Sequence, residues 1–466
     1  MLTAIPETSP RVPRTRGLAI VAALAVAVVC AACSNYMARS ADVKLSFADA
    51  DYDEALKRVE KIGRDGSELL YLYEKGLVLH FQNDFDTSNA VLEQAEQVLE
   101  DLYTKSVTRE IAGLAVSDVI TKYRGEPFEA VLVNYYKILN YLHMGDISGA
   151  LVECRRVNRK LQMLSDAGET DFGNDPFLQY LTGMVYRIGG EPDAAGVSFR
   201  VAVASYDTLM AAGGVGPPEP LYCDAAEIAR IFSEHEVADS LFARAECPRV
   251  PQGAGVVNLF LECGFVAHKE ERDVVLPIFK NDETNDIDDF ALVLAAREGV
   301  AYADDPELDY ILKVAVPILV PTPVPWECAV VRAAAPSGEF QPSPAVVVDD
   351  MNWYATAAFE ADYSKILVRA IVRGLTKYLA KQGADEKDEG LGWLVNMLGV
   401  VTETADTRSW STLPEKIMMA RLVLPAGTYD LQVDLMEAGG RRIETITIPG
   451  VAVEAGETRF MNHRIF

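Results

Sequence analysis

The sequence predicts a multidomain protein of the α plus β class. We expect an N-terminal α-solenoid of degenerate helical repeats, followed by a C-terminal β-sandwich-like domain with one long inserted helix. Residues from about 48 to 247 show helical periodicity with almost no strand signal. Beyond residue 250, short β-rich runs alternate with Gly and Pro turn signals. The chain of 466 residues, 50% of them hydrophobic, is long enough for about two to four domains, and the two patterns narrow this number to two.

The N-terminal residues are predicted to direct export. Three arginines within residues 1–16 precede an apolar run without charges at 17–29, which is the pattern of a secretory signal peptide. The run is shorter than the roughly 20 apolar residues that a membrane-spanning helix needs. Its end, Cys30-Ala31-Ala32-Cys33, resembles the lipobox of bacterial lipoproteins.

That resemblance implies that Cys33 is acylated and becomes the mature N-terminus. Residues 1–32 would then be the lipoprotein signal peptide, and residues 33–47 would link the lipid anchor to the repeats. Ser34, and not Asp, follows the modified cysteine. In this family that implies sorting to the outer membrane, with the protein facing the periplasm. An ordinary cleaved signal or an uncleaved anchor is the alternative interpretation.

Residues 48–250 are interpreted as a domain of degenerate tetratricopeptide-like repeats. In this repeat, small residues let the two helices of a pair approach, and large residues fill the groove against the next pair. The sets that match this pattern are Gly183, Tyr186, Ala195, Phe199 and Ala202; Gly76, Leu79, Ser88, Leu92 and Ala95; Ala226, Ala229, Ala238, Phe242 and Ala245; and Ile138, Tyr141, Ala150, Cys154 and Val157. Their spacing is irregular, so we expect an extra helix at 108–123 to fill the first gap. The segment 50–62 resembles the second helix of a further, leading unit. The alternative is a generic helical bundle with no peptide groove.

Residues 251–466 are interpreted as a β-rich domain into which a helix is inserted at about 351–382. The expected strands lie at 256–262, 272–279, 310–320, 327–333, 345–348, 418–425, 427–437, 441–453 and 457–466. Along 427–437, apolar and polar residues alternate, which is typical of a half-buried strand. The segment LPAGTYDLQV at 424–433 resembles the strand pairs of prealbumin-like and carbohydrate-binding-like sandwich modules. This implies a fold and not sugar binding.

The cysteines give two open interpretations. The chain has 7 cysteines, and their wide spacing without CxxC or interleaved histidines does not indicate a zinc site. Cys223 and Cys247 flank one predicted helix pair, so a disulfide between them is one hypothesis in an oxidising compartment. The other is that they are buried, unpaired small hydrophobic residues.

No motif for catalysis, cofactor binding or metal binding is found. The chain lacks HExxH, GxSxG, P-loop and GxGxxG patterns. An EF-hand-like run begins at Asp49, Asp51 and Asp53, but it carries Glu54 where the loop needs Gly. We interpret it as acids at a helix start. We therefore expect no catalytic residue, no metal and no cofactor. With 43 Lys and Arg against 69 Asp and Glu, the chain is too acidic for a general nucleic-acid binder.

The long predicted helix carries an ordered row of cations in this acidic chain. The members follow one another at i,i+4 spacing along one side: Lys365, Arg369, Arg373, Lys377 and Lys381. One interpretation is a solvated face, or pairing with the protein's own acids. The functional hypothesis is a docking stripe for an anionic partner or lipid head group.

As a whole, the chain is similar to an uncharacterised family of bacterial lipoproteins with tetratricopeptide-like repeats. The segments that carry the resemblance are 74–96, 123–158, 264–270, 405–414 and 424–431, of which ADTRSWSTLP at 405–414 is the most specific. The family implies export and repeats, and it implies no catalytic residues. Polar and aromatic residues of these segments suggest a further hypothesis, a ligand cleft lined by Arg124, Arg155, Arg408 and Trp410.

These observations predict a lipid-anchored scaffold of the cell envelope. Its helical repeats would bind partner proteins, its lipid would hold it to the membrane, and it would bind no nucleic acid. The alternative is an envelope enzyme or accessory factor that acts on cell-wall or surface polysaccharide. Clustered carboxyl groups with perturbed pKa values in a deep cleft would favour the enzyme.

Overall fold

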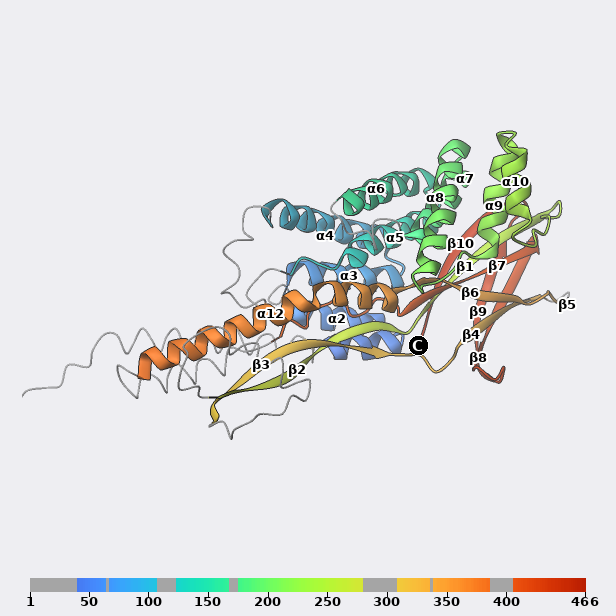
Figure 1. Cartoon of the computed structure of the whole chain (residues 1–466). Helices are drawn as coiled ribbons and strands as arrows, with labels where there is room; N and C mark the ends of the chain where they lie inside the picture. The colour runs from blue at the N-terminus through green and yellow to red at the C-terminus, as the bar shows by residue number, and fades with distance from the viewer. Residues whose placement is uncertain are drawn as a thin grey trace, which may run out of the picture.

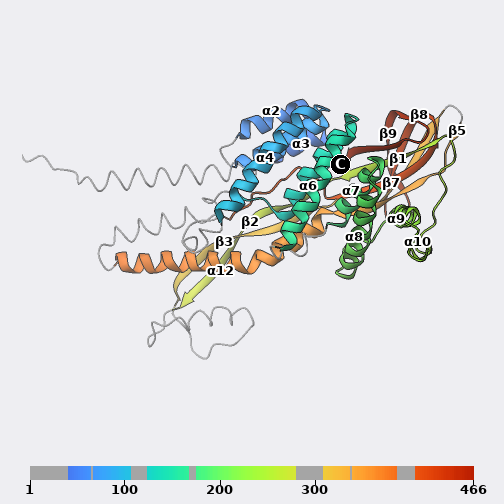
Figure 2. The same cartoon turned by 90° about the horizontal axis from the view of Figure 1, so that it is seen from above.

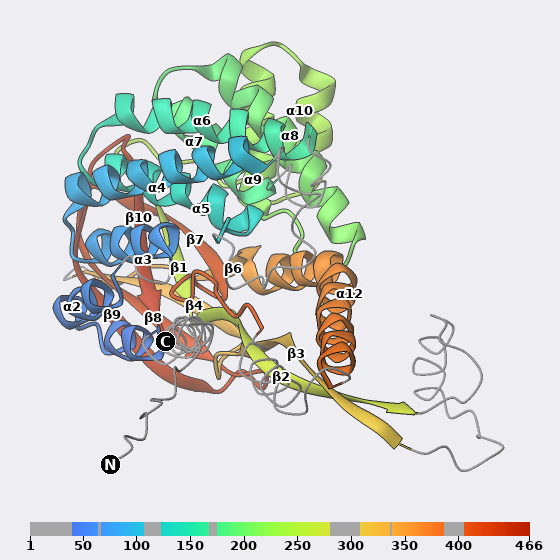
Figure 3. The same cartoon turned by 90° about the vertical axis from the view of Figure 1, so that its left-hand side faces the viewer.

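A computed structural model of the protein describes residues 40–63, 67–106, 123–166, 175–279, 308–335, 338–385 and 405–466. Cys33 and the helix expected at 108–123 lie outside these described residues, apart from Tyr123. An array of helices covers one side of a large sheet, and an elongated arm extends from the sheet (Figures 1 and 3).

The N-terminal half consists of consecutive helices that pack as antiparallel pairs and stack on one another (Figure 1). Residues 40–48 are helical and precede α2. The later helices are α2 Tyr52–Ile62, α3 Glu68–Phe81, α4 Phe85–Ser106, α5 Pro127–His143, α6 Ile147–Asp166, α7 Pro176–Ile188, α8 Pro192–Ala211, α9 Glu219–Ile231 and α10 His235–Phe242. The predicted α-solenoid of tetratricopeptide-like pairs is therefore confirmed for the described residues.

The same turn joins the two helices of every pair. In each turn one residue has a positive φ, between 53° and 75°, namely Ala50, Asn83, Gly145, Gly190 and Ser233. The N–H of the following residue donates to the carbonyl five positions earlier, at 2.8–3.0 Å, in all of them. This is the hydrogen bond of the Schellman motif, which satisfies carbonyls at a helix end. The first of these turns shows that residues 40–62 form a complete leading pair, as the pattern at 50–62 predicted.

The small residues of the repeat pattern lie where the helices of a pair touch. A Cβ at Gly76 would be 2.4 Å from Leu92, and a Cβ at Gly183 would be 2.4 Å from the Phe199 ring. Ala195 and Phe199 are fully buried. Each glycine therefore makes room for the large residue that the repeat pattern places opposite it.

We expect Gly183→Ala to lower the free energy of unfolding by about 1–2 kcal/mol. Overpacking costs about 1–3 kcal/mol, and the better helix propensity of Ala offsets up to about 1 kcal/mol of it. Urea denaturation followed by circular dichroism measures the change. Gly439→Ala is the control, because no atom lies within 4 Å of a Cβ at that position. Equal stability of the two variants would contradict the packing role of Gly183.

The C-terminal half forms one eight-stranded sheet in the order β10-β1-β7-β6-β4-β8-β9, with β5 paired to β4. Its strands are β1 Ala254–Cys263, β4 Cys328–Ala335, β5 Gly338–Glu339, β6 Ser343–Asp350, β7 Lys416–Pro425, β8 Gly427–Met436, β9 Arg442–Val453 and β10 Thr458–Ile465. β1 and β10 pair in parallel, and the other pairings are antiparallel.

The predicted β-sandwich stays a prediction. β6 pairs with both β7 and β4 and so joins the β10-β1-β7 half of the sheet to the β4-β8-β9 half. Strands β1 and β7 lie beside β8 and β9 (Figure 2), and apolar side chains of β1, β7, β4, β8 and β9 pack in one core. A Cβ at Gly255 in β1 would lie 2.4 Å from the carbonyl oxygen of Glu454, just after β9. The sheet therefore curls until its β9 end reaches β1.

An arm extends from this body and contains α12 Met351–Asp385 together with the ribbon of β2 Phe265–Phe279 and β3 Leu308–Thr322 (Figure 3). The helix is inserted between β6 and β7, as the sequence predicts. Ala370 of α12 packs against Val314 and Val316 of β3. We refer to α12, β2 and β3 as the arm.

The hypothesis of a disulfide between Cys223 and Cys247 agrees with the structure, in which the two sulfur atoms are bonded. The bond ties α9 to the segment that follows α10. Cys154 and Cys263 are buried free cysteines, and Cys328 is an exposed one.

Candidate functional site

The inner face of the helix array is covered by the protein's own sheet. Side chains of α3, α5 and α7 share one apolar core with β1, β7 and β10. For example, Phe260 of β1 lies against Phe177 of α7, with ring centroids 5.4 Å apart, and against Tyr135 of α5 at 6.3 Å. Solenoids commonly present such a concave surface to partners. In this protein the sheet fills it.

The segment 405–415, which includes the motif ADTRSWSTLP, lies on the same inner face. The Trp410 ring stacks on Tyr73 of α3 at 4.4 Å, and its backbone N–H donates to Glu129 Oε1 at 2.8 Å. The backbone N–H of Ser411 donates to Glu74 Oε1 at 3.1 Å, and the Thr412 hydroxyl donates to the other oxygen of Glu74. The array therefore holds this segment through ring stacking and through hydrogen bonds to buried carboxylates.

Burial perturbs the carboxyl groups that hold this segment. Glu74 is buried, which raises the pKa of its carboxyl group. Burial, with the nearby charge of Glu126, also raises the pKa of Glu129 to about 7. Neither group lines an open cleft, because Glu74 is 4% exposed and Glu129 is 1% exposed.

A buried polar centre joins the array to the sheet. Glu262 of β1 accepts hydrogen bonds from Tyr135 at 3.1 Å, from Tyr136 at 2.8 Å and from Asn462 at 2.8 Å. Arg464 of β10 lies 3.5 Å from the same carboxylate, and the two side chains are 1% and 0% exposed. Burial raises the pKa of Glu262, and Arg464 opposes this rise. The centre fixes the register between α5 and the two strands.

His80 of α3 belongs to the same centre and is held neutral. Asn140 Oδ1 lies 2.6 Å from Nδ1, and Asn462 Nδ2 donates to Nε2 at 2.8 Å. These partners assign the proton to Nδ1. Burial, together with the charge of His143, lowers the pKa of His80 to about 3.

We expect His80 to make the protein less stable in acid. In the unfolded chain His80 binds a proton below about pH 6.5, its ordinary pKa. In the folded protein His80 stays neutral down to about pH 3. The free energy of unfolding should therefore fall by about 1.4 kcal/mol per pH unit, or by about 2 kcal/mol between pH 6.5 and pH 5.

Urea denaturation at pH 7 and pH 5 tests this expectation. His80→Asn should lose this part of the pH dependence, whatever its effect on stability at pH 7. His235→Asn is the control, because His235 is exposed at the start of α10. An equal pH dependence in wild type and His80→Asn would contradict the assignment.

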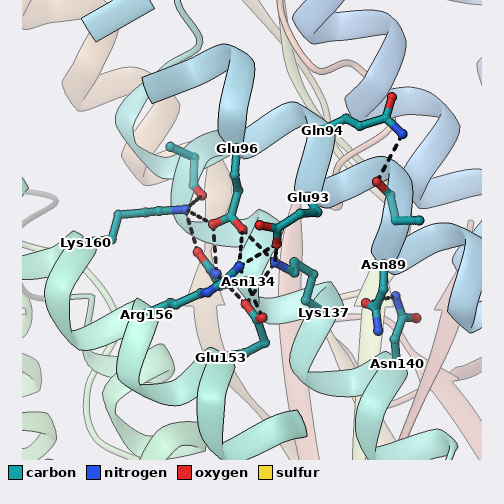
Figure 4. Close-up of polar contacts among 12 residues, drawn as sticks. Asn89, Glu93, Gln94, Glu96, Asn134, Lys137, Asn140, Glu153, Arg156 and Lys160 are labelled. Atoms are coloured by element: carbon teal, nitrogen blue, oxygen red, sulfur yellow. Dashed lines mark hydrogen bonds and ion pairs between the residues drawn. The ribbon is translucent and has the colours of Figure 1, made fainter. Parts of the chain in front are cut away.

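A second polar cluster links α4, α5 and α6 inside the array (Figure 4). Lys137 Nζ contacts Glu93 and Glu96 at 2.6 Å and Glu153 at 3.1 Å. Burial alone would lower the pKa of Lys137, but the carboxylates of Glu96 and Glu153 outweigh it and raise the pKa. Arg156 and Lys160 complete the cluster from α6. All these partners belong to the protein itself, so the cluster connects successive helix pairs.

The residues of the hypothetical ligand cleft have different surroundings. Trp410 is fully buried, and Arg408 is 7% exposed and pairs with Asp406 at 2.7 Å. Arg124 is exposed, and Arg155 makes an exposed ion pair with Glu191 at 2.6 Å. Trp410 and Arg408 thus have structural contacts. The cleft stays a prediction that these contacts do not test.

The cationic row lies on α12. Lys365 is exposed and pairs with Asp362 at 2.7 Å, and Arg369 is exposed on the next turn. Arg373, Lys377 and Lys381 continue the row along the helix, and their side chains lie outside the described residues.

The acids of the EF-hand-like run act at a helix start, as expected. Asp51 is the N-cap of α2, and its carboxylate accepts from the N–H of Glu54 at 3.0 Å. Among the described residues, no group of His, Cys, Asp and Glu has the arrangement needed to hold a metal ion. The described helices include none that is long and apolar enough to span a membrane.

A cavity of about 500 Å³ lies at the base of the arm, between β3 and α12. Its apolar lining includes Ile318, Leu319 and Phe359, and Asn352 and Glu360 supply polar atoms. Such a lining could accept an apolar group. We assign it no ligand.

These features define a class of protein: an array of tetratricopeptide-like helix pairs whose inner face is occupied by a sheet of the same chain. No protein-family model and no curated protein matches the chain.

Solved structures similar to the chain are helical. MamA from Desulfovibrio magneticus RS-1 is 14% identical, and the match covers 46% of this chain and 92% of that chain with a TM-score of 0.29. TPR-like repeats of a Podosopora anserina kinesin light chain are 11% identical over 45% of this chain and 92% of that chain, with a TM-score of 0.30. The TPR2AB domain of yeast Sti1, in complex with pHSP90, is 11% identical over 45% of this chain and 76% of that chain, with a TM-score of 0.22. Because these TM-scores are low, the assignment of helix pairs rests on the turns and packing described above.

The sequence interpretation missed Glu262, Glu74 and His80 as members of buried polar centres. No local pattern marks these three residues, but α5 shows that the inner face of the array is covered. All residues from Phe128 to Asn140 in α5 are buried, and nine of these thirteen are apolar. A helix of this kind is surrounded by other elements, so it could not line an open groove.

Proposed function

We propose that the protein is a lipid-anchored scaffold of the bacterial cell envelope, which binds partner proteins through the outer faces of its helix pairs. The observation that carries the proposal is the occupied inner face. Since the sheet and the segment 405–415 fill the usual groove, the outer helices α4, α6, α8 and α10 are the part of the array left for partners.

Exposed apolar residues on these outer helices support the proposal. Val152 of α6 is 47% exposed and Val197 of α8 is 54% exposed. Each lies two positions after the small residue that the repeat pattern places in its helix, Ala150 and Ala195 respectively, so they occupy equivalent positions in successive pairs. Stacking repeats such positions on one surface. Val152 and Val197 therefore give a partner two apolar contacts on adjacent helix pairs.

The test compares proteins recovered with the tagged lipoprotein from detergent-solubilised envelopes, using quantitative mass spectrometry. Val152→Asp combined with Val197→Asp should lose specific partners that wild type retains. The matched control is Val346→Asp with Ile443→Asp, which places the same charge at exposed residues of the sheet (39% and 42% exposed). Recovery of no specific partner with wild type, or the same loss in both variants, would contradict the proposal.

The anchor has a separate test. Labelling of cells with a fatty-acid analogue should mark the wild-type protein and not Cys33→Ala. Equal labelling of both would refute acylation at Cys33.

We propose a non-catalytic role in place of the envelope enzyme. The enzyme hypothesis expects carboxyl groups with perturbed pKa values in a deep cleft. Glu74, Glu129 and Glu262 have raised pKa values, but they are buried between the array and the sheet and bind the protein's own donors. This supports structural roles for them.

A further inference from the structure

The outer face of α12 carries cations and valines together. Lys365, Val368, Arg369 and Val372 follow i, i+3, i+4 and i+7 spacing, which places them on one side of a helix. Val368 is 56% exposed and Val372 is 42% exposed, and both cations are exposed. The opposite side, with Ala370, packs on β3. We call these four residues the arm stripe.

The charge around the arm stripe is opposite to that of the rest of the protein. From 363 to 384 the sequence holds five cations and no Asp or Glu, in a chain with a formal charge of −26. Asp362, just before this range, pairs with Lys365. Clusters of cations on a helix attract anionic lipid head groups. The exposed valines beside them add apolar surface that can contact lipid.

The course of the chain places the base of the arm near the proposed lipid anchor. The Ser40 and Ser411 hydroxyls are hydrogen-bonded to each other, and the Ala405 N–H donates to Glu271 of β2 at 2.7 Å. The six residue steps from Ala405 to Ser411 span at most about 20 Å, and the seven from Cys33 to Ser40 span at most about 25 Å. A lipid on Cys33 would therefore lie within about 50 Å of the base of the arm, roughly the length of a 35-residue helix such as α12.

We propose that the arm lies on the membrane surface and binds anionic phospholipid through the arm stripe. This inference rests on the proposed envelope location, but it does not require acylation. The chain would then have two contacts with the membrane, and two weak contacts together give stable attachment where one is marginal.

The test uses the unlipidated chain 34–466, which keeps every described residue. Its sedimentation is measured with vesicles of phosphatidylcholine containing about 30% phosphatidylglycerol, whose negative surface potential attracts cations, and with phosphatidylcholine alone. We expect binding to the anionic vesicles only, and binding that weakens as salt rises. Lys365→Glu with Arg369→Glu should lower the affinity for anionic vesicles at least about tenfold. Each basic residue near the membrane surface raises that affinity about fivefold. Val368→Ser with Val372→Ser should also weaken it.

The matched control reverses two exposed cations outside the arm, Lys57→Glu and Arg200→Glu, which have exposed fractions of 69% and 54%. This control should bind anionic vesicles much more tightly than the variant Lys365→Glu with Arg369→Glu. Circular dichroism checks that all variants are folded. The proposal is overturned if wild type does not bind anionic vesicles, if both reversals weaken binding equally, or if the arm reversal dissociates a dimer seen by sedimentation velocity without changing vesicle binding. Because the chain carries no lipid, none of these results bears on Cys33.

Discussion

Glu262→Leu should lower the free energy of unfolding by about 3–5 kcal/mol, because it leaves the guanidinium of Arg464 in the core without its carboxylate. It also removes the acceptor of Tyr135, Tyr136 and Asn462, and a buried donor without an acceptor costs about 1–3 kcal/mol. Urea denaturation followed by circular dichroism and tryptophan fluorescence measures the effect.

A double-mutant cycle separates the ion pair from general damage to the core. Arg464→Met alone should also be strongly destabilising, since it leaves the Glu262 carboxyl group without its cation. Glu262→Leu with Arg464→Met should cost clearly less than the sum of the single changes. Additive costs would show that the two side chains do not stabilise each other, and would contradict a polar centre between array and sheet.

Lys137→Met is expected to cost about 3 kcal/mol, because it removes the cation between three carboxylates of α4 and α6 (Figure 4). Arg156 and Lys160 remain beside Glu96, which keeps the cost at the lower end of the range for a broken buried pair. Thermal and urea denaturation give the change.

The matched control is Lys75→Met, which breaks the ion pair of Lys75 with Glu60. That pair has the same 2.6 Å separation but its side chains are 24% and 49% exposed. Exposed pairs contribute about 0–1 kcal/mol, so the control should cost less than 1 kcal/mol. Similar losses of stability in Lys137→Met and Lys75→Met would show that the buried ion pairs of Lys137 stabilise the protein no more than an exposed pair does.

Local patterns in the sequence predicted most of the helices and strands. Gly76 and Gly183 mark close helix contacts, because a Cβ at either position would lie 2.4 Å from Leu92 or Phe199, and the repeat pattern predicted a small residue at both positions. The alternation at Tyr429, Leu431, Val433 and Leu435 corresponds to β8. Three of the five pair-joining turns use Ala50, Asn83 and Ser233 at positive φ, so glycine alone could not locate them.

The candidate site was less predictable, because it depends on contacts between distant segments. Periodicity shows that a side chain is buried, but it does not show what buries it. Tyr136 and Glu262 are 126 positions apart, and Trp410 and Glu129 are 281 apart. The same limit applies to the sheet, since no local pattern shows that β6 pairs with both β7 and β4.

The sequence by itself determined the helix pairs, the strands, the inserted helix and the cationic row, because each depends on neighbours within a few residues. It also supplied the export signal and Cys33, which remain predictions. Only the tertiary structure decided that the sheet and the segment 405–415 occupy the inner face of the array. The physical reason is that burying this face requires a complementary surface, and the chain supplies that surface from residues more than a hundred positions away.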